Sequence, residues 1–119
     1  MAGGFNTSTK TVMMQKVNTT KGNTGLFIKG TPGEYVVPVL ESSDDNYMNM
    51  LVGTTEQVTV NSKSADGNYV NFKYTIKSGD QKPRFYEFTD GSTLSANKAY
   101  LQVPASWLPV TSEARTMNI

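Results

Sequence analysis

The residues of this chain to weigh first for acid–base chemistry are carboxylates, because its 119 residues include no histidine and no cysteine. Without histidine the commonest general base and metal ligand is missing, and without cysteine there is no thiolate nucleophile and no disulfide. The carboxylates show no catalytic spacing. Asp44 and Asp45 are neighbours in a polar stretch, whereas paired glycosidase carboxylates face each other across a cleft, roughly 5–10 Å apart. The sequence predicts no enzymatic activity and no cofactor.

Oxygen donors in the polar loops leave a structural calcium ion open as an alternative. The chain lacks the alternating carboxylates and terminal glutamate of a calcium-binding EF-hand loop, and turn chemistry explains the same residues. Residues 30–33 have neither the spacing nor the Gly-Lys-Ser/Thr ending of a phosphate-binding loop. We therefore assign no metal or nucleotide site. The loop donors in question are Asp44, Asp45, Asn46, Asp66 and Asp90.

The aromatic side chains are the one set with a binding chemistry, because flat rings stack on the faces of sugars. Tyrosine is also an ordinary strand residue with an apolar body and a polar tip, so packing in or on a sheet is the simpler explanation. A low-ranked ligand- or partner-binding surface is predicted at Tyr35, Tyr47, Tyr86, Tyr100 and Trp107.

Overall composition narrows the class of protein. The net charge is +1, with 18% charged and 37% hydrophobic residues, which is too apolar for intrinsic disorder and too neutral for electrostatic binding of nucleic acid. No run approaches the roughly 20 apolar residues of a membrane helix. Residues 1–5 lack the basic and apolar regions of a signal peptide. The chain is expected to be either cytoplasmic or a piece of a longer exported protein.

Residues 1–10 are rich in Gly, Asn, Thr and Ser and are predicted to be a flexible N-terminal segment, followed by a single β domain at 11–119. Strand-like runs alternate with turn signals such as Asp66-Gly67, and almost no helical periodicity is present. Pro38 indicates an edge or bulged strand. Predicted strands lie at 11–17, 24–30, 35–40, 48–53, 57–60, 68–76, 84–88, 98–104 and 114–119.

These short strands predict an all-β fold, because a half-apolar strand can bury its face only against another sheet. We expect a two-sheet antiparallel β-sandwich, immunoglobulin-like or similar, with a small β-barrel as the alternative. The stretch 85–104 is interpreted as a hairpin-like element. Tyr100 is expected on the more polar face of its strand, together with Gln102. The predicted core faces comprise Val70, Phe72, Tyr74 and Ile76 in one strand and Ala99, Leu101 and Val103 in another.

Several short segments of the chain form an ordered set of motifs. They are Gly25-Leu26-Phe27-Ile28-Lys29-Gly30, Gly33-Glu34-Tyr35-Val36-Val37-Pro38, Asn49-Met50-Leu51-Val52-Gly53-Thr54, Phe85-Tyr86 through Gly91, Leu94, Ala96, Lys98-Ala99-Tyr100-Leu101 and Pro104, and Ala114-Arg115-Thr116-Met117-Asn118-Ile119. In their order they resemble the motifs of a known family, a repeated all-β module of large cell-surface and secreted proteins of Bacteroides-type bacteria. The chain departs from the family at 68–76, where a shorter Y-V-L-S segment is usual, and at Ser95, where proline is common.

The resemblance implies a non-catalytic structural or adhesion-type interaction module within a bacterial surface or secreted multidomain protein. Its expected partners are the neighbouring domains of a longer chain, with a host or dietary glycan or protein as a further candidate. The implied location is extracellular or at the cell surface, and the isolated domain is expected to be a monomer. The alternative function is a carbohydrate-binding module that uses exposed Tyr and Trp side chains.

Overall fold

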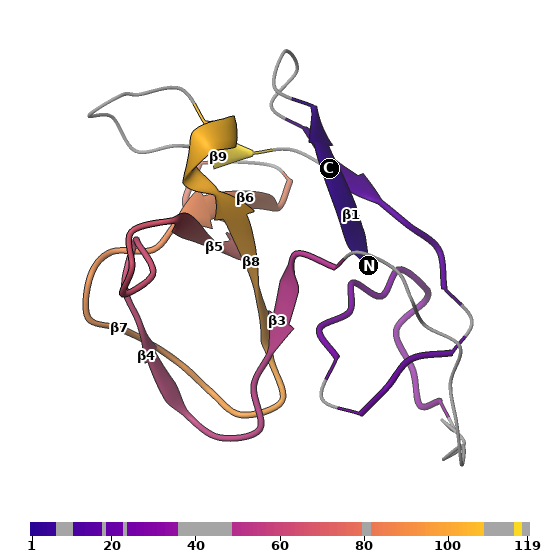
Figure 1. Ribbon diagram of the computed structural model, residues 1–119. Helices are drawn as coiled ribbons and strands as arrows, with labels where there is room; N and C mark the ends of the chain where they lie inside the picture. The colour runs from indigo at the N-terminus through magenta and orange to yellow at the C-terminus, as the bar shows by residue number, and fades with distance from the viewer. Residues whose placement is uncertain are drawn as a thin grey trace.

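The computed structural model of the chain describes residues 1–6, 11–17, 19–22, 24–35, 49–79, 82–108 and 116–117. Apart from one short 3-10 helix, the regular elements of this part are strands, so the predicted all-β class is confirmed. The strands form three antiparallel sheets, an arrangement consistent with a β-sandwich (Figure 1). The difference from the prediction is that two small sheets flank a central one.

The central sheet has five strands. Their bounds are Leu51–Gly53 (β3), Tyr69–Thr75 (β5), Arg84–Glu87 (β6), Ala99–Pro104 (β8) and Thr116–Met117 (β9). The spatial order is β3-β8-β5-β6-β9, with every pair antiparallel. The short β9 lies within the predicted last strand at 114–119.

The hairpin-like interpretation of the stretch 85–104 is wrong. β5 lies between β6 and β8 and pairs with both, so the two ends of the stretch do not pair with each other. β5 has seven residues, long enough for its first part, Tyr69–Phe72, to pair with β8 and its last part, Phe72–Thr75, to pair with β6. The connection from β6 to β8 is also much longer than the two to five residues that fix a hairpin.

Two ribbons of two strands each flank the central sheet. One pairs Ala2–Asn6 (β1) with Thr11–Met14 (β2), and the other pairs Val58–Val60 (β4) with Ser92–Leu94 (β7). In Figure 1 the two ribbons lie on opposite sides of β8. The 3-10 helix, Ala105–Trp107 (η1), follows β8 directly.

The composition of residues 1–10 predicts a flexible segment, but residues 2–6 form the strand β1. Met1 and Ala2 are buried, and Ala2 belongs to the same core cluster as Val12, Phe72 and Leu101. The Met50 N–H donates to the Ala2 carbonyl at 2.8 Å. Burial and hydrogen bonding by a distant part of the chain thus override a local composition that favours a loop.

The Asn49 side chain links the β1–β2 ribbon to the central sheet through hydrogen bonds. Its Oδ1 accepts hydrogen bonds from the N–H groups of Ala2 (3.2 Å) and Leu51 (3.1 Å). Its Nδ2 donates to the Gly25 carbonyl at 2.8 Å. One amide therefore joins β1, β3 and the segment that begins at Thr24.

The predicted strand at 24–30 is reduced to a single bridge between Thr24 and Val52, and Ile28 is 84% exposed. Gly25 passes so close to β3 that a Cβ there would lie 2.7 Å from the Leu51 carbonyl carbon. A side chain at this position is therefore excluded by sterics. The predicted strand at 35–40 lies outside the described residues beyond Tyr35.

The main core lies between the central sheet and the β1–β2 ribbon. Its fully buried side chains alternate along β5 and β8, as the period-two pattern predicts, for Val70, Phe72, Leu101 and Val103. Tyr74 keeps to this face, with its ring 5.1 Å from that of buried Phe85, although its side chain is partly exposed. Ile76, which follows the end of β5, is 58% exposed and does not join the core. The pairing of β5 with β8 stops at Phe72, so the last part of β5 extends beyond its neighbour.

The predicted Asp66-Gly67 turn forms, with Gly67 at φ 76°, and Asp90-Gly91 makes a second turn, with Gly91 at φ 81°; both glycines lie in the left-handed region that favours glycine. Within the part of the chain that the structure describes, no helix is long and apolar enough to span a membrane.

Candidate binding site

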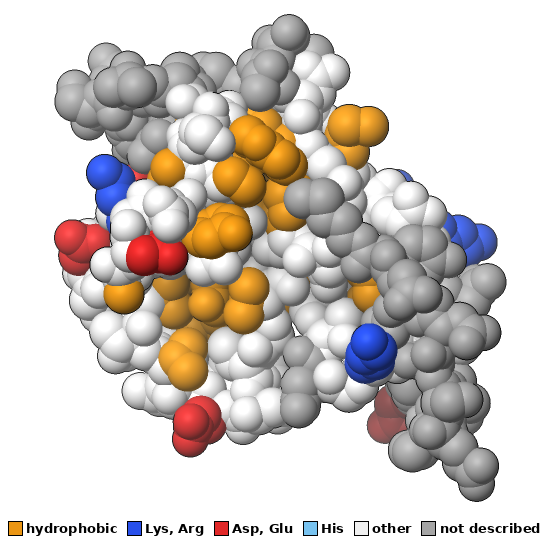
Figure 2. All heavy atoms as spheres, in the orientation of Figure 1, with side chains coloured by type: hydrophobic (Ala, Val, Ile, Leu, Met, Phe, Trp, Pro, Cys, Tyr) orange, Lys and Arg blue, Asp and Glu red, His pale blue; other side chains and the backbone are white. Residues whose placement is uncertain are grey.

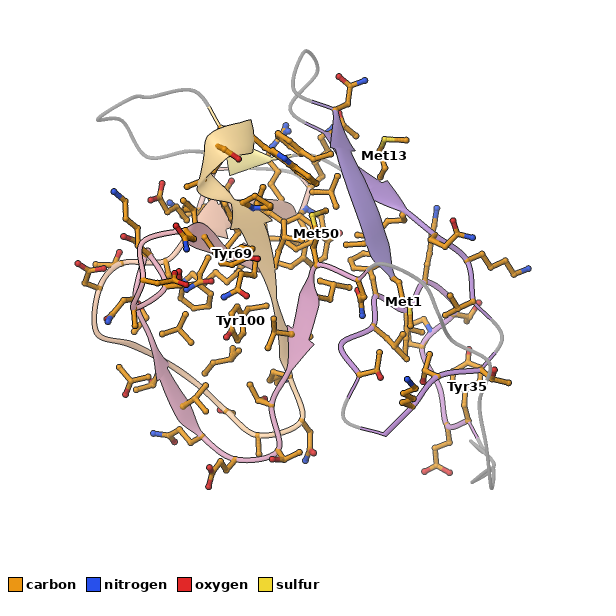
Figure 3. All side chains as sticks on the ribbon, viewed as in Figure 1. Met1, Met13, Tyr35, Met50, Tyr69 and Tyr100 are labelled. Carbon is orange, nitrogen blue, oxygen red and sulfur yellow. The ribbon has the colours of Figure 1, made fainter. Side chains whose placement is uncertain are left out.

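The central sheet has a polar face opposite its core. Because side chains alternate along a strand, the residues between the buried ones point to this second face. Asn71 of β5 is paired with Gln102 of β8, and Tyr69 with Pro104. Tyr100 precedes Gln102 on the same side of β8, as the sequence predicts. Figure 3 shows Tyr69 and Tyr100 on the same side of β8, toward β4.

A hollow of about 490 Å³ lies over this face, with β4 as its outer wall. Asn71, Tyr100 and Gln102 contribute to its lining from the central sheet. A second hollow of about 290 Å³ shares Val52 and Gln102 with the first and is also lined by Tyr69 and Pro104. We call the two together the sheet-face groove. Figure 2 shows hydrophobic side chains gathered over the central sheet in this view, interspersed with polar surface.

The amide of Asn71 is the fixed point of the groove. Asn71 lies on the face opposite Val70 and Phe72 and is nevertheless only 4% exposed. Its Oδ1 accepts a hydrogen bond from Gln102 Nε2 at 3.1 Å, and its Nδ2 donates to the Asn61 carbonyl at 3.0 Å. Its burial is therefore compensated by hydrogen bonds. The chain of amides sets the orientation of Gln102.

Tyr100 provides an oriented aromatic ring. The ring packs edge-on against buried Phe88, with centroids 6.0 Å apart and an interplanar angle of 89°. The Tyr100 hydroxyl has no hydrogen-bond partner among the described residues, and it is not a buried unsatisfied group. It is therefore open to a ligand in the groove.

The groove carries little net charge. Glu56 and Lys63 are the charged residues among those that line the larger hollow, and they have opposite signs. The smaller hollow is lined by uncharged residues. The recognition chemistry on offer is therefore hydrogen bonding and apolar contact.

Of the residues predicted as a binding surface, Tyr100 lies in the groove. Tyr35 is 69% exposed and donates through its hydroxyl to the Thr31 carbonyl in its own loop. Tyr47 lies outside the described residues. The structure thus does not bring Tyr35 and Tyr100 into one platform.

Tyr86 and Trp107 have other surroundings. Tyr86 is paired with Lys73 across β5 and β6, and Lys77 Nζ lies 4.2 Å from the centroid of its ring, in cation–π geometry. Trp107 ends η1 and packs, partly buried, against the main core. Neither lines the groove.

The two described aspartates of the polar loops stabilise turns. Asp66 accepts hydrogen bonds from the Ser64 hydroxyl at 2.7 Å and the Asn68 N–H at 2.9 Å. These bonds lower the pKa of Asp66 below its usual value, the Ser64 bond having the larger effect. Asp90 accepts from the Ser62 N–H at 2.8 Å. In the described part of the chain no three His, Cys, Asp or Glu side chains gather as metal ligands, and Asp44, Asp45 and Asn46 lie outside it.

The sequence-based candidates left out the groove residues Tyr69, Asn71 and Gln102. Alternation alone places Gln102 beside Tyr100, so that signal was available in β8. The role of Asn71 could not be predicted from alternation, because it depends on the register that places Asn71 opposite Gln102.

Comparison of the chain with protein-family models, with curated proteins and with solved structures finds no match. The resemblance of the short motifs to a bacterial surface module stays a prediction. The geometry of the groove therefore carries most of the functional argument.

Proposed function

We propose that the chain is a non-catalytic interaction module of a bacterial surface or secreted multidomain protein, and that it binds its ligand in the sheet-face groove. The observation that carries the proposal is the fixed amide pair Asn71–Gln102 beside an open Tyr100 hydroxyl. Groups that are already oriented lose little conformational entropy on binding, which favours recognition.

The described aspartates support a binding role over a catalytic one. A general acid or base must lie within hydrogen-bond reach of the reacting group. Asp66 and Asp90 instead hold the backbone of the turns beside the groove. The carboxylates of both aspartates therefore stabilise turns by accepting hydrogen bonds.

The surface location rests on the short motifs and on where they fall in the fold. The motif at residues 98–101 supplies the start of β8, including the buried Leu101 and the groove residue Tyr100. The motif at 49–54 supplies the Asn49 amide and β3. The resemblance therefore falls on residues of the core, of β3 and of the groove.

The test is antibody labelling of intact cells of the organism that produces the protein. Labelling of intact cells that is lost after protease treatment is the expected result. A cytoplasmic protein probed in parallel controls for lysis. Labelling confined to permeabilised cells would overturn the proposed location.

The predicted alternative, a carbohydrate-binding module, is favoured by one observation, the Tyr100 ring and Gln102 amide side by side on β8. In that case the platform would be built from the groove and not from Tyr35 or Trp107.

A further inference from the structure

We propose that the sheet-face groove binds a neutral oligosaccharide, with the Tyr100 ring against the apolar face of a sugar and the Gln102 amide on its hydroxyls. The inference rests on the proposed interaction role and names the class of ligand for it. It follows from four properties of the groove.

The first property is charge. The opposite signs of Glu56 and Lys63 provide no field for a strongly anionic or cationic ligand. The smaller hollow, which includes Tyr69 and Pro104, has an uncharged lining. A phosphate-rich or polyanionic ligand requires a cluster of basic groups, so the ligand is neutral.

The second property is the state of the backbone. β8 is paired on both sides, with β3 and β5, and β5 is paired with β8 and β6. An extended peptide that adds to a sheet needs an open strand edge for its main-chain hydrogen bonds. Asn71, Tyr100 and Gln102 belong to these interior strands, so a ligand meets them through their side chains, while β3 and β4 line the larger hollow at its sides.

The third property is hydrogen-bonding capacity. Gln102 uses Nε2 toward Asn71, and its Oε1 accepts no hydrogen bond from the described residues. The Tyr100 hydroxyl both donates and accepts. A ligand with several hydroxyls matches such mixed groups, because each hydroxyl also donates and accepts.

The fourth property is the pair of rings along the strand. Tyr69 is level with Pro104, four residues beyond Tyr100 on β8, which corresponds to roughly 13 Å along the strand. A ligand that contacts both tyrosines is longer than one sugar ring. The groove therefore fits a chain of sugars better than a monosaccharide.

The test is affinity electrophoresis of the full chain in gels that contain one neutral polysaccharide each: a β-glucan, an α-glucan, a xylan or a mannan. Retardation by at least one of them is expected, and the matching oligosaccharide is then titrated with ¹⁵N-labelled protein. The Gln102 side-chain amide and the backbone amides of β8 are expected to shift.

Two variants locate the site. Tyr100→Phe removes only the hydroxyl and keeps the ring on Phe88, while Gln102→Met removes the amide at similar volume. Each is expected to weaken binding by about 2–10-fold, the range of one hydrogen bond. Tyr35→Phe is the matched control, because it deletes a hydroxyl from an exposed tyrosine outside the groove lining.

The inference is overturned if no gel retards the protein, or if Tyr100→Phe and Gln102→Met bind as Tyr35→Phe does. Thermal unfolding of each variant shows whether a loss of binding comes from misfolding. If Gln102→Met is misfolded, the binding result for Tyr100→Phe decides. Failure here leaves the surface labelling result intact. The ligand class and the proposed role are thus tested separately.

Discussion

The two faces of the central sheet differ in what holds them in place. On one face Val70, Phe72 and Leu101 are fully buried and pack against the N-terminal ribbon. On the other, Asn71 and Gln102 are linked amide to amide above an open hollow. Alternate residues of the same two strands thus form the packed core on one face and, on the other, the hydrogen-bonded amides of the proposed binding groove. Changes on one face therefore have a different measurable effect from changes on the other.

The largest effect is expected from the apolar face. Phe72→Ala removes a fully buried ring from the centre of the main core, and truncations of this kind lower the free energy of unfolding by about 3–5 kcal/mol. Urea denaturation followed by circular dichroism measures it. Ile76→Ala, at an exposed position just past the same strand, is the control and should stay within about 0.5 kcal/mol of the parent. Equal midpoints for the two variants would contradict the assignment of the core face.

A smaller loss of folding stability is expected from a substitution on the polar face. Asn71→Ala removes the partner of Gln102 Nε2 and of the Asn61 carbonyl. Unmade hydrogen bonds of this kind cost about 1–3 kcal/mol. The same variant frees Gln102, so saccharide affinity should fall together with stability. Gln57→Ala, an exposed amide outside the groove lining, should change neither, and an unchanged urea midpoint for Asn71→Ala would show that the amide pair contributes nothing.

The third largest effect is expected at the turn that is hydrogen-bonded to the end of β4, the outer wall of the groove. The Gly91 N–H donates to Asn61 Oδ1 at 2.9 Å, and Gly91 has φ 81°. Gly91→Ala places a Cβ in the left-handed region, at a cost of roughly 1–2 kcal/mol. Gly22→Ala is the matched control, since Gly22 has ordinary φ and open space around it. Differential scanning calorimetry should show a lower melting temperature for Gly91→Ala and an unchanged one for Gly22→Ala.

The smallest effect is expected from acid. The folded-state pKa of Asp66 lies below the usual 3.8, so its stabilising contribution is present above that value and is lost as the pH falls through the folded pKa. An NMR titration of the Asp66 carboxyl should give a midpoint below 3.8. Ser64→Ala removes the main cause and should bring the midpoint back toward 3.8. A midpoint that does not move with this substitution would refute the hydrogen bond as the cause.

Local pattern was sufficient for part of the fold. The alternation of Val70 with Phe72 and of Leu101 with Val103 identifies the core face, because each strand repeats every two residues whatever its partner. The pairing of β5 between β6 and β8 was not predictable in this way. Partner choice depends on contacts between segments far apart in the chain, and the stretch 85–104 contains no signal for the intervening strand.

The same distinction applies to the groove. Tyr100 was a candidate because its aromatic ring suits the face of a sugar, and the structure places it in the groove lining. Alternation places Asn71 only on the face opposite Val70 and Phe72. Its burial was not predictable, because its partners are 10 residues away at Asn61 and 31 residues away at Gln102. Tyr35 was ranked equally with Tyr100 because aromatic type does not reveal which rings the fold brings together.

The Asn49 amide has a consequence for how the molecule opens. It contacts chain segments 47 residues away at Ala2 and 24 residues away at Gly25. Such contacts form only after long loops have closed, so they belong to the late events of folding. Because one side chain serves both segments, detachment of either leaves Asn49 with unpaired groups and weakens the other. Sub-global unfolding should therefore release the N-terminal ribbon and the Gly25 segment as one cooperative unit, with linked hydrogen-exchange rates.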